Sequence, residues 1–245
     1  MIRIILKLSE QFSSFSGMLQ APKGNLEGHR ECMQTRLQTL GGEALADYEL
    51  LEMALHIALP QADTRGLARA LLLRFGSFAA IIAAPRRDLL EVRGITPATV
   101  DILKVVQAAA LRLARADVID QPVLDNWDRL MNYLTAVLAR ERVEQCRVLF
   151  LDARNRLLAD ETQARGTVNH TPLYPREVVK RALEHHASGL ILVHNHPSGD
   201  TTPSRDDIDM TYEVKRASAA LSIALHDHVI VGNGCWLSFR REGLL

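Results

Sequence analysis

The stretch from Leu190 to Asp209, LILVHNHPSGDTTPSRDDID, limits most narrowly what this chain can fold into. It begins with a short apolar run rich in β-branched residues, which predicts a buried strand over residues 190–196. A proline and a glycine then turn the chain sharply, and Pro203-Ser204 predicts the start of a helix over residues 204–221. This succession of strand, turn and helix indicates a domain that mixes strands with helices.

The end of the predicted strand carries metal-ligand residue types. Side chains alternate along a strand, so His194 and His196 point to one face and Asn195 to the other. Asp207 falls in the first turn of the following helix. Two imidazoles and a carboxylate suit Zn²⁺, and three protein ligands leave a fourth position for water, as in catalytic zinc sites.

Each piece of this pattern also has an ordinary explanation. Paired strand histidines are often surface residues, and Ser204 followed three positions later by Asp207 is a common helix-start pattern. The combination of strand, HxH, tight turn, SxxD and helix is much more specific than any one piece.

The first part of the chain has helical patterns throughout. Ser, Gly and Pro punctuate residues 1–27, which predicts a flexible tail, and Met18 is an alternative start of the native chain. A helical domain is expected over residues 28–116, and a linker containing Pro122 over residues 117–126. The predicted helices of this domain cover residues 29–40, 47–58, 65–75, 78–84 and two more between 89 and 116.

The segment Leu89–Lys104 predicts two helices joined by a tight turn at 93–96, and it resembles a helix-hairpin-helix. Such modules offer backbone N–H groups and a basic residue to a DNA phosphate. The usual turn has two glycines, whereas here Thr96 stands in place of the second, after Gly94. A side chain there crowds the approach of a phosphate. Both DNA contact, helped by Arg93 and Lys104, and a pure packing role stay open.

Composition narrows the class of protein. The 29 Lys and Arg balance the 29 Asp and Glu among 245 residues, so net charge provides no argument for nucleic acid or membrane. Three widely spaced cysteines form no disulfide framework and fit a reducing cytoplasm. No apolar run has membrane-spanning length, and charge interrupts the apolar start that resembles a signal peptide. We therefore expect a cytoplasmic protein without membrane association.

From Gln145 onward the period of the pattern changes from helical to extended. Strands are predicted over 146–151, 156–164, 225–231 and 235–239, and helices over 127–138 and 175–186. With the strand and helix of the opening stretch, these indicate a two- or three-layer α/β sandwich over residues 127–245.

Within this domain, HxH-x7-SxxD at residues 194–207 matches the JAMM (MPN+) metalloprotease pattern at every fixed position. The wider chain resembles the RadC family of bacterial proteins, long labelled DNA repair proteins. The supporting stretches are VLFLDARNRLLADE, YPREVVKRALEHHASGLILVHNHPSGDTTPS and LHDHVIVGNGCWLSF. The resemblance covers residues 28–245 and is most specific over 144–239. It implies two domains, the second having a mixed sheet flanked by helices of the cytidine-deaminase-like type.

The resemblance also implies a site. JAMM enzymes hold zinc through the residues that match His194, His196 and Asp207 here. Their catalytic base is a glutamate just before the first strand of the domain, which matches Glu144. The alternative base is Glu161 on the second strand. The residue matching Ser204 orients or stabilises the developing oxyanion.

Several of these residues keep ordinary alternatives. Glu144 closes a mostly charged run and is also explained as a solvated helix end, while Glu177 is expected to cap or support the helix it begins. The second HxH, His226-Asp227-His228, is not followed by SxxD. Its His228 is expected either near the metal ligands or in simple core packing.

Three hypotheses for the function follow. The first is a zinc-dependent hydrolase that uses metalloprotease chemistry on a peptide or isopeptide bond. The second is a DNA-binding or DNA-repair-associated protein, which reaches DNA through the helical domain and uses the zinc domain as a nuclease or accessory module. The third is a scaffold with a structural zinc, against which the open fourth coordination position argues. The sequence specifies neither the substrate nor the oligomeric state.

Overall fold

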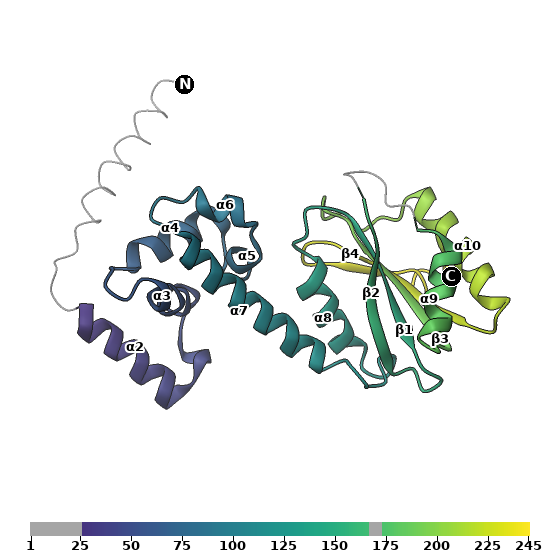
Figure 1. The fold of residues 1–245 in the computed structure, drawn as a ribbon, viewed down its shortest axis with the longest axis horizontal. Coiled ribbons are helices and arrows are strands. Elements are labelled where there is room, and N and C mark those ends of the chain that lie inside the picture. Colours follow the sequence, from purple (N-terminus) through teal and green to yellow (C-terminus); the bar gives the residue numbers. More distant parts are fainter. Residues whose placement is uncertain (1–25, 167–172) are drawn as a thin grey trace, which may run out of the picture. The chain divides into compact units, whose positions relative to one another are not determined.

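The structure, a computed structural model, describes residues 26–166 and 173–245. The expected tail over residues 1–27 thus lies almost wholly outside the described residues. The chain divides into two compact units, with the division between Val106 and Gln107 inside helix α7 (Pro97–Ala116). Figure 1 shows helices alone in the described part of the first unit and a sheet with flanking helices in the second. The domain boundaries expected at 28–116 and 127–245 stay a prediction.

The first unit buries an apolar core among short helices whose ends are set by their local sequence. Helix α4 (Arg65–Phe75) is followed by Gly76, which has a φ of 89°. Helix α5 (Phe78–Ala83) begins after Ser77, whose hydroxyl accepts a 3.2 Å hydrogen bond from the amide of Ala80. Leucine is the most frequent residue in this core, which also contains Ala, Ile and Val side chains. The elements, followed by the first half of α7, are α2 (Leu26–Leu40), η1 (Gly42–Ala44), α3 (Asp47–Ala58), α4 (Arg65–Phe75), α5 (Phe78–Ala83) and α6 (Arg86–Leu90).

The connection between α6 and α7 is longer than the turn at 93–96 that the sequence predicts, because α6 already ends at Leu90 and α7 begins at Pro97. Gly94 has a φ of 94°, and the hydroxyl of Thr96 accepts a 3.2 Å hydrogen bond from the amide of Thr99, so Thr96 caps α7. Arg93 is exposed, but the ammonium group of Lys104 donates a 2.8 Å hydrogen bond to the carbonyl of Ile82 within the same unit. One of the two charges considered for a DNA phosphate thus has a partner inside this unit, and DNA binding stays a prediction.

The second unit is organised around a five-stranded mixed sheet in the order β2-β1-β3-β4-β5. Only the central pair of β3 and β4 is parallel, and the remaining neighbours are antiparallel. The strands are β1 (Gln145–Leu151), β2 (Leu157–Arg165), β3 (Gly189–Asn195), β4 (Ala224–Val231) and β5 (Trp236–Ser238).

Helices cover both faces of this sheet, so the second unit is a three-layer α/β/α sandwich (Figure 1). Helix α8 (Trp127–Leu138) packs on one face through buried side chains that include Leu130 and Leu134. Helices α9 (Pro175–Glu184) and α10 (Arg205–Ala219) pack on the other face through Val178 and Val214, among others. The sheet is apolar on both faces because each is covered by helices.

The expected linker over residues 117–126 packs with the second unit. Val118 and Val123 are buried in the core beneath α8, and Ile119 and Pro122 form isolated bridges to the start of β2. Hydrophobic burial and backbone pairing therefore join this segment to the sheet.

Among the described residues, no helix combines the length and the apolar character that crossing a bilayer would require.

A matched pair of substitutions on α4 tests the first core. Leu71 is completely buried, so Leu71→Ala should lower the free energy of unfolding by about 2–5 kcal/mol through lost burial and a residual cavity. Leu73 is 91% exposed on the same helix, and Leu73→Ala should change it by less than about 0.5 kcal/mol. Denaturant unfolding of the full chain, followed by circular dichroism, measures both. Equal effects of the two changes would contradict the placement of Leu71 in the core.

Candidate metal centre

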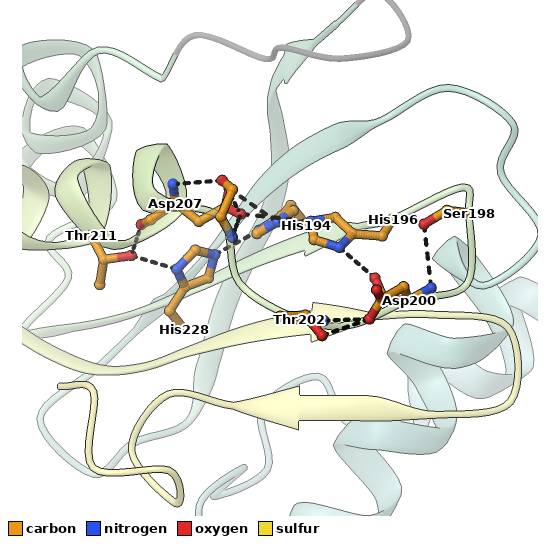
Figure 2. A network of polar contacts seen from close by, with 9 residues as sticks. His194, His196, Ser198, Asp200, Thr202, Asp207, Thr211 and His228 are labelled. Carbon is orange, nitrogen blue, oxygen red and sulfur yellow. Dashed lines mark hydrogen bonds and ion pairs between the residues drawn. The ribbon is translucent and has the colours of Figure 1, made fainter.

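Three side chains with metal-binding atoms meet where β3 ends and α10 begins (Figure 2). His194 is the last but one residue of β3, and His196 follows the strand, with its amide donating a 3.0 Å hydrogen bond to the carbonyl of Val231. Asp207 lies in the first turn of α10. The structure therefore brings the two histidines and the aspartate of the sequence motif together.

The spacing of these atoms fits a tetrahedral metal. The Nε2 atoms of His194 and His196 are 2.9 Å apart. Oδ1 of Asp207 lies 3.3 Å from Nε2 of His194, and Oδ2 of Asp207 lies 3.7 Å from Nε2 of His196. Ligands at 2.0–2.1 Å from a tetrahedral zinc are roughly 3.3–3.4 Å apart, so the three side chains lie close enough to share one ion. The donor set and its spacing therefore suit one ion.

The Nδ1 atoms of both histidines face protein groups instead. Nδ1 of His196 lies 2.6 Å from the carbonyl oxygen of Asp200, and Nδ1 of His194 lies 2.7 Å from Nε2 of His228. A partner at Nδ1 orients the ring, and Nε2 then points to the shared position.

Ser204 caps α10 and holds Asp207 at the same time. Its hydroxyl and its amide donate hydrogen bonds of 2.6 and 2.8 Å to Oδ2 of Asp207, and the hydroxyl accepts one of 3.1 Å from the amide of Asp207. The capping explanation of SxxD is therefore confirmed, and the same hydrogen bonds reach the carboxylate of the expected ligand set. The hydroxyl proton is directed at Asp207, so the structure shows Ser204 as a residue that positions this carboxylate. Its oxyanion role stays a prediction.

The charges of the centre stabilise one another. Burial raises the pKa of Asp207, but hydrogen bonding with His194 and His196 outweighs it and holds that pKa well below its usual range. Hydrogen bonding with Asp207 raises the pKa of His196. A cation that replaced the histidine protons would meet a carboxylate that is already ionised.

Glu144 lies across from His196. In the antiparallel pair of β1 and β3, Cys146 is opposite His194, and continuing this register by two residues brings Glu144 opposite His196 on the same face. Its charge contributes to the raised pKa of His196, after the larger effect of Asp207. Glu144 is half-buried, and its carbonyl accepts a 3.0 Å hydrogen bond from the amide of Gly166.

The side chain of Asn195 fastens the segment that carries Glu144. Asn195 is 1% exposed, and its Oδ1 accepts a 2.9 Å hydrogen bond from the amide of Gln145. Its Nδ2 donates to the carbonyls of Glu141 and Val143, each at 3.3 Å. Asn195 points away from the metal ligands, as the strand alternation indicates, and it ties the ligand strand to the backbone on both sides of Glu144.

The alternative base, Glu161, is engaged elsewhere. Its carboxylate forms ion pairs with Arg181 of α9 and with His185, and the Arg181 hydrogen bond is the main reason that its pKa falls to about 2. Glu177 lies in the first turn of α9 and pairs with the exposed Arg176. A carboxylate with so low a pKa is a weak base. The role of Glu144 as the base stays a prediction.

Two residues of this centre are absent from the predicted set. Thr211 was not singled out by the sequence, although it follows Asp207 by one helical turn. Of the two positions expected for His228, the structure shows the one near the ligand residues, in direct contact with His194. The parallel pairing of β3 with β4 is the signal that would have joined His228 to the site.

Known proteins of similar sequence match this chain over both of its units. A family model described as "RadC-like JAB domain" matches residues 124–244. A UPF0758 protein of Rhodobacter capsulatus is 57% identical over 213 residues, which cover 87% of this chain and 100% of the relative. A UPF0758 protein of Ruegeria pomeroyi is 51% identical over 220 residues, which cover 90% of this chain and 98% of the relative. The similarity is therefore not confined to the metal-ligand motif.

The ion pairs of Glu161 predict an acid-sensitive contribution to stability. Its pKa in the folded chain, about 2, lies below the ordinary value of 4.5, so the stabilisation is present above pH 4.5 and is lost as pH falls toward 2. Glu161→Gln should lower the free energy of unfolding by about 1–2 kcal/mol at neutral pH, after allowance for solvent screening, and by almost nothing near pH 2.

Denaturant unfolding at a series of pH values measures this difference. Glu177→Gln is the matched control, because the carboxylate of Glu177 is largely exposed and should give a small and nearly constant effect. A Glu161→Gln effect that does not shrink in acid would show that its ion pairs do not stabilise the fold.

Proposed function

The chain belongs to the RadC family, and on this premise we propose that its second unit is a zinc-dependent hydrolase of amide bonds, acting on a peptide or an isopeptide. The observation that carries this proposal is the convergence of His194, His196 and Asp207 on one position. The JAB-type domain supports a hydrolase, and the register that brings Glu144 opposite His196 supports a base beside the ligands.

Zinc is the proposed ion because of the ligand types. Two imidazoles and one carboxylate form a common catalytic zinc set, and three protein ligands leave a position for the reacting group. When bound, zinc would supply a water of lowered pKa and would polarise the carbonyl of the substrate.

The residues of the chain supply the proton transfers and the orientation. Glu144 would take a proton from the attacking water and pass it to the leaving nitrogen, which without that proton is a poor leaving group. Ser204 holds the Asp207 carboxylate, and we propose that its hydroxyl also turns toward the oxygen that becomes negative in the transition state. Asn195 keeps the Glu144 segment in register with the ligand strand.

DNA binding through the helical unit is the alternative function. No contact within the described residues favours it, and Lys104 donates to a carbonyl of its own unit. The alternative stays a prediction, and the substrate screen below includes DNA for that reason.

Metal analysis tests the ligand assignment. The wild-type chain, loaded with zinc and dialysed, should contain about one zinc ion per chain, and the double variant with His194→Ala and His196→Ala should contain none. His186→Asn is the control, because His186 is exposed and asparagine tolerates its φ of 53°. Elemental analysis measures the ratio. A metal-free wild type, or full occupancy of the double variant, would sink the zinc proposal.

Substitution of the base tests the chemistry. The zinc-loaded full chain is screened with quenched fluorescent peptides, isopeptide-linked peptides and labelled single- and double-stranded DNA. Glu144→Gln should keep zinc and lower kcat for the hydrolysed substrate by about 10²–10⁴-fold, because glutamine cannot accept the proton. Glu141→Gln, on the same segment, should keep near-normal activity. Full activity of Glu144→Gln would remove Glu144 from the mechanism, and cleavage of DNA alone would favour the alternative function.

A further inference from the structure

Behind His194 lies a chain of polar groups that is closed off from solvent (Figure 2). It runs from the backbone carbonyl of Asp207 through the hydroxyl of Thr211 and the ring of His228 to the ring of His194. Thr211 and His228 are completely buried, and His194 is 1% exposed. The ring of Phe239 covers His228 at a centroid distance of 4.4 Å.

Each of the three contacts in this series of polar groups has the length of a hydrogen bond. The hydroxyl of Thr211 lies 2.5 Å from the carbonyl oxygen of Asp207 and 2.6 Å from Nδ1 of His228. Nε2 of His228 lies 2.7 Å from Nδ1 of His194. A buried polar group costs free energy unless it is hydrogen-bonded, so the protons should be arranged to satisfy all three contacts.

When His228 is neutral, only one arrangement of the protons satisfies all three contacts. The carbonyl of Asp207 can only accept, so the single hydroxyl proton of Thr211 must point toward it. Nδ1 of His228 must then donate to Thr211, and Nε2 of a neutral His228 must accept. The proton between the two rings therefore belongs to Nδ1 of His194, and Nε2 of His194 is the atom left for the metal.

The reversed arrangement, in which each donor and acceptor is exchanged, leaves one contact without a proton. If His194 were protonated on Nε2 alone, His228 would donate from Nε2 and accept at Nδ1 from Thr211. The 2.5 Å contact between Thr211 and the carbonyl of Asp207 would then join two acceptors with no proton between them. A His228 protonated on both nitrogens is disfavoured because its ring is fully buried beside other imidazoles.

We propose that Thr211 and His228 are positioning residues that hold His194 as its Nδ1–H tautomer and so present Nε2 to the metal. This inference rests on the proposed function, because it assumes that His194 is a metal ligand. Thr211 is on α10, four residues after Asp207, and His228 is on β4. The hydrogen-bonded series therefore joins α10 and β3, which carry Asp207 and His194, through β4.

The outer partner of a ligating histidine is worth about 10–100-fold in metal affinity. Thr211→Val keeps the shape of the side chain and removes the hydroxyl, so the Nδ1–H of His228 loses its acceptor. Thr211→Ser keeps the hydroxyl. Zinc dissociation constants of the full chain, measured in competition with a chromophoric chelator, should be about 10–100-fold higher for Thr211→Val and within about 3-fold of wild type for Thr211→Ser.

A second measurement needs no metal. Long-range ¹H–¹⁵N NMR of the metal-free full chain, recorded over a series of pH values because Asp207 raises the pKa of His196, identifies the ring nitrogens that carry protons. The wild type should show the proton of His194 on Nδ1 and that of His228 on Nδ1, and Thr211→Val should shift the tautomer populations of both rings. A role in packing alone would leave both tautomers unchanged in Thr211→Val.

The outcomes separate the two proposals. Absence of zinc binding by the wild type overturns the proposed function itself. Zinc binding by the wild type that Thr211→Val leaves unchanged overturns the positioning role alone. If Thr211→Val fails to fold, the spectrum of the wild type decides, because a His194 or a His228 protonated on Nε2 alone would overturn the inference.

Discussion

The parallel pairing of β3 with β4 is the constraint on which the rest of the site depends. Parallel neighbours need a crossover connection, and here that connection contains α10. The helix must begin beyond the end of β3, so its first turn, with Asp207, faces the two histidines that end the strand. The same pairing brings His228 beside His194. One element of backbone topology thus brings both Asp207 and His228 to His194.

The neighbouring antiparallel pair of β1 and β3 positions Glu144, the proposed base. Its register is anchored by the side chain of Asn195, which bonds to the backbone of Gln145 and to two carbonyls of the preceding turn. Because the side-chain period of a strand is two residues, a slip by one residue would turn Glu144 to the opposite face. The buried amide of Asn195 therefore supports the function of the site although it touches none of the ligands.

Much of the local structure was predictable from the sequence. The patterns over 47–58 and 65–75 coincide with α3 and α4, and the predicted strands over 146–151 and 225–231 differ from β1 and β4 by one residue. These elements follow from apolar periodicity and from Gly and Pro at their ends, which act within a few residues. The segment 117–126 was expected as a linker because no periodicity marks it, yet Val118 and Val123 are buried against the sheet.

The sequence by itself determined the metal-ligand motif, since HxH on a strand and SxxD at a helix start are local patterns whose geometry follows from the backbone. Only the tertiary structure distinguished the surroundings of the two carboxylates. Glu161 is held by Arg181 and His185, whereas Glu144 comes opposite His196 through strand register. Only the tertiary structure joined Thr211 and His228 to His194, because that contact spans three elements. Pairing between distant strands is set by the packing of the whole sheet, which no short stretch of sequence specifies.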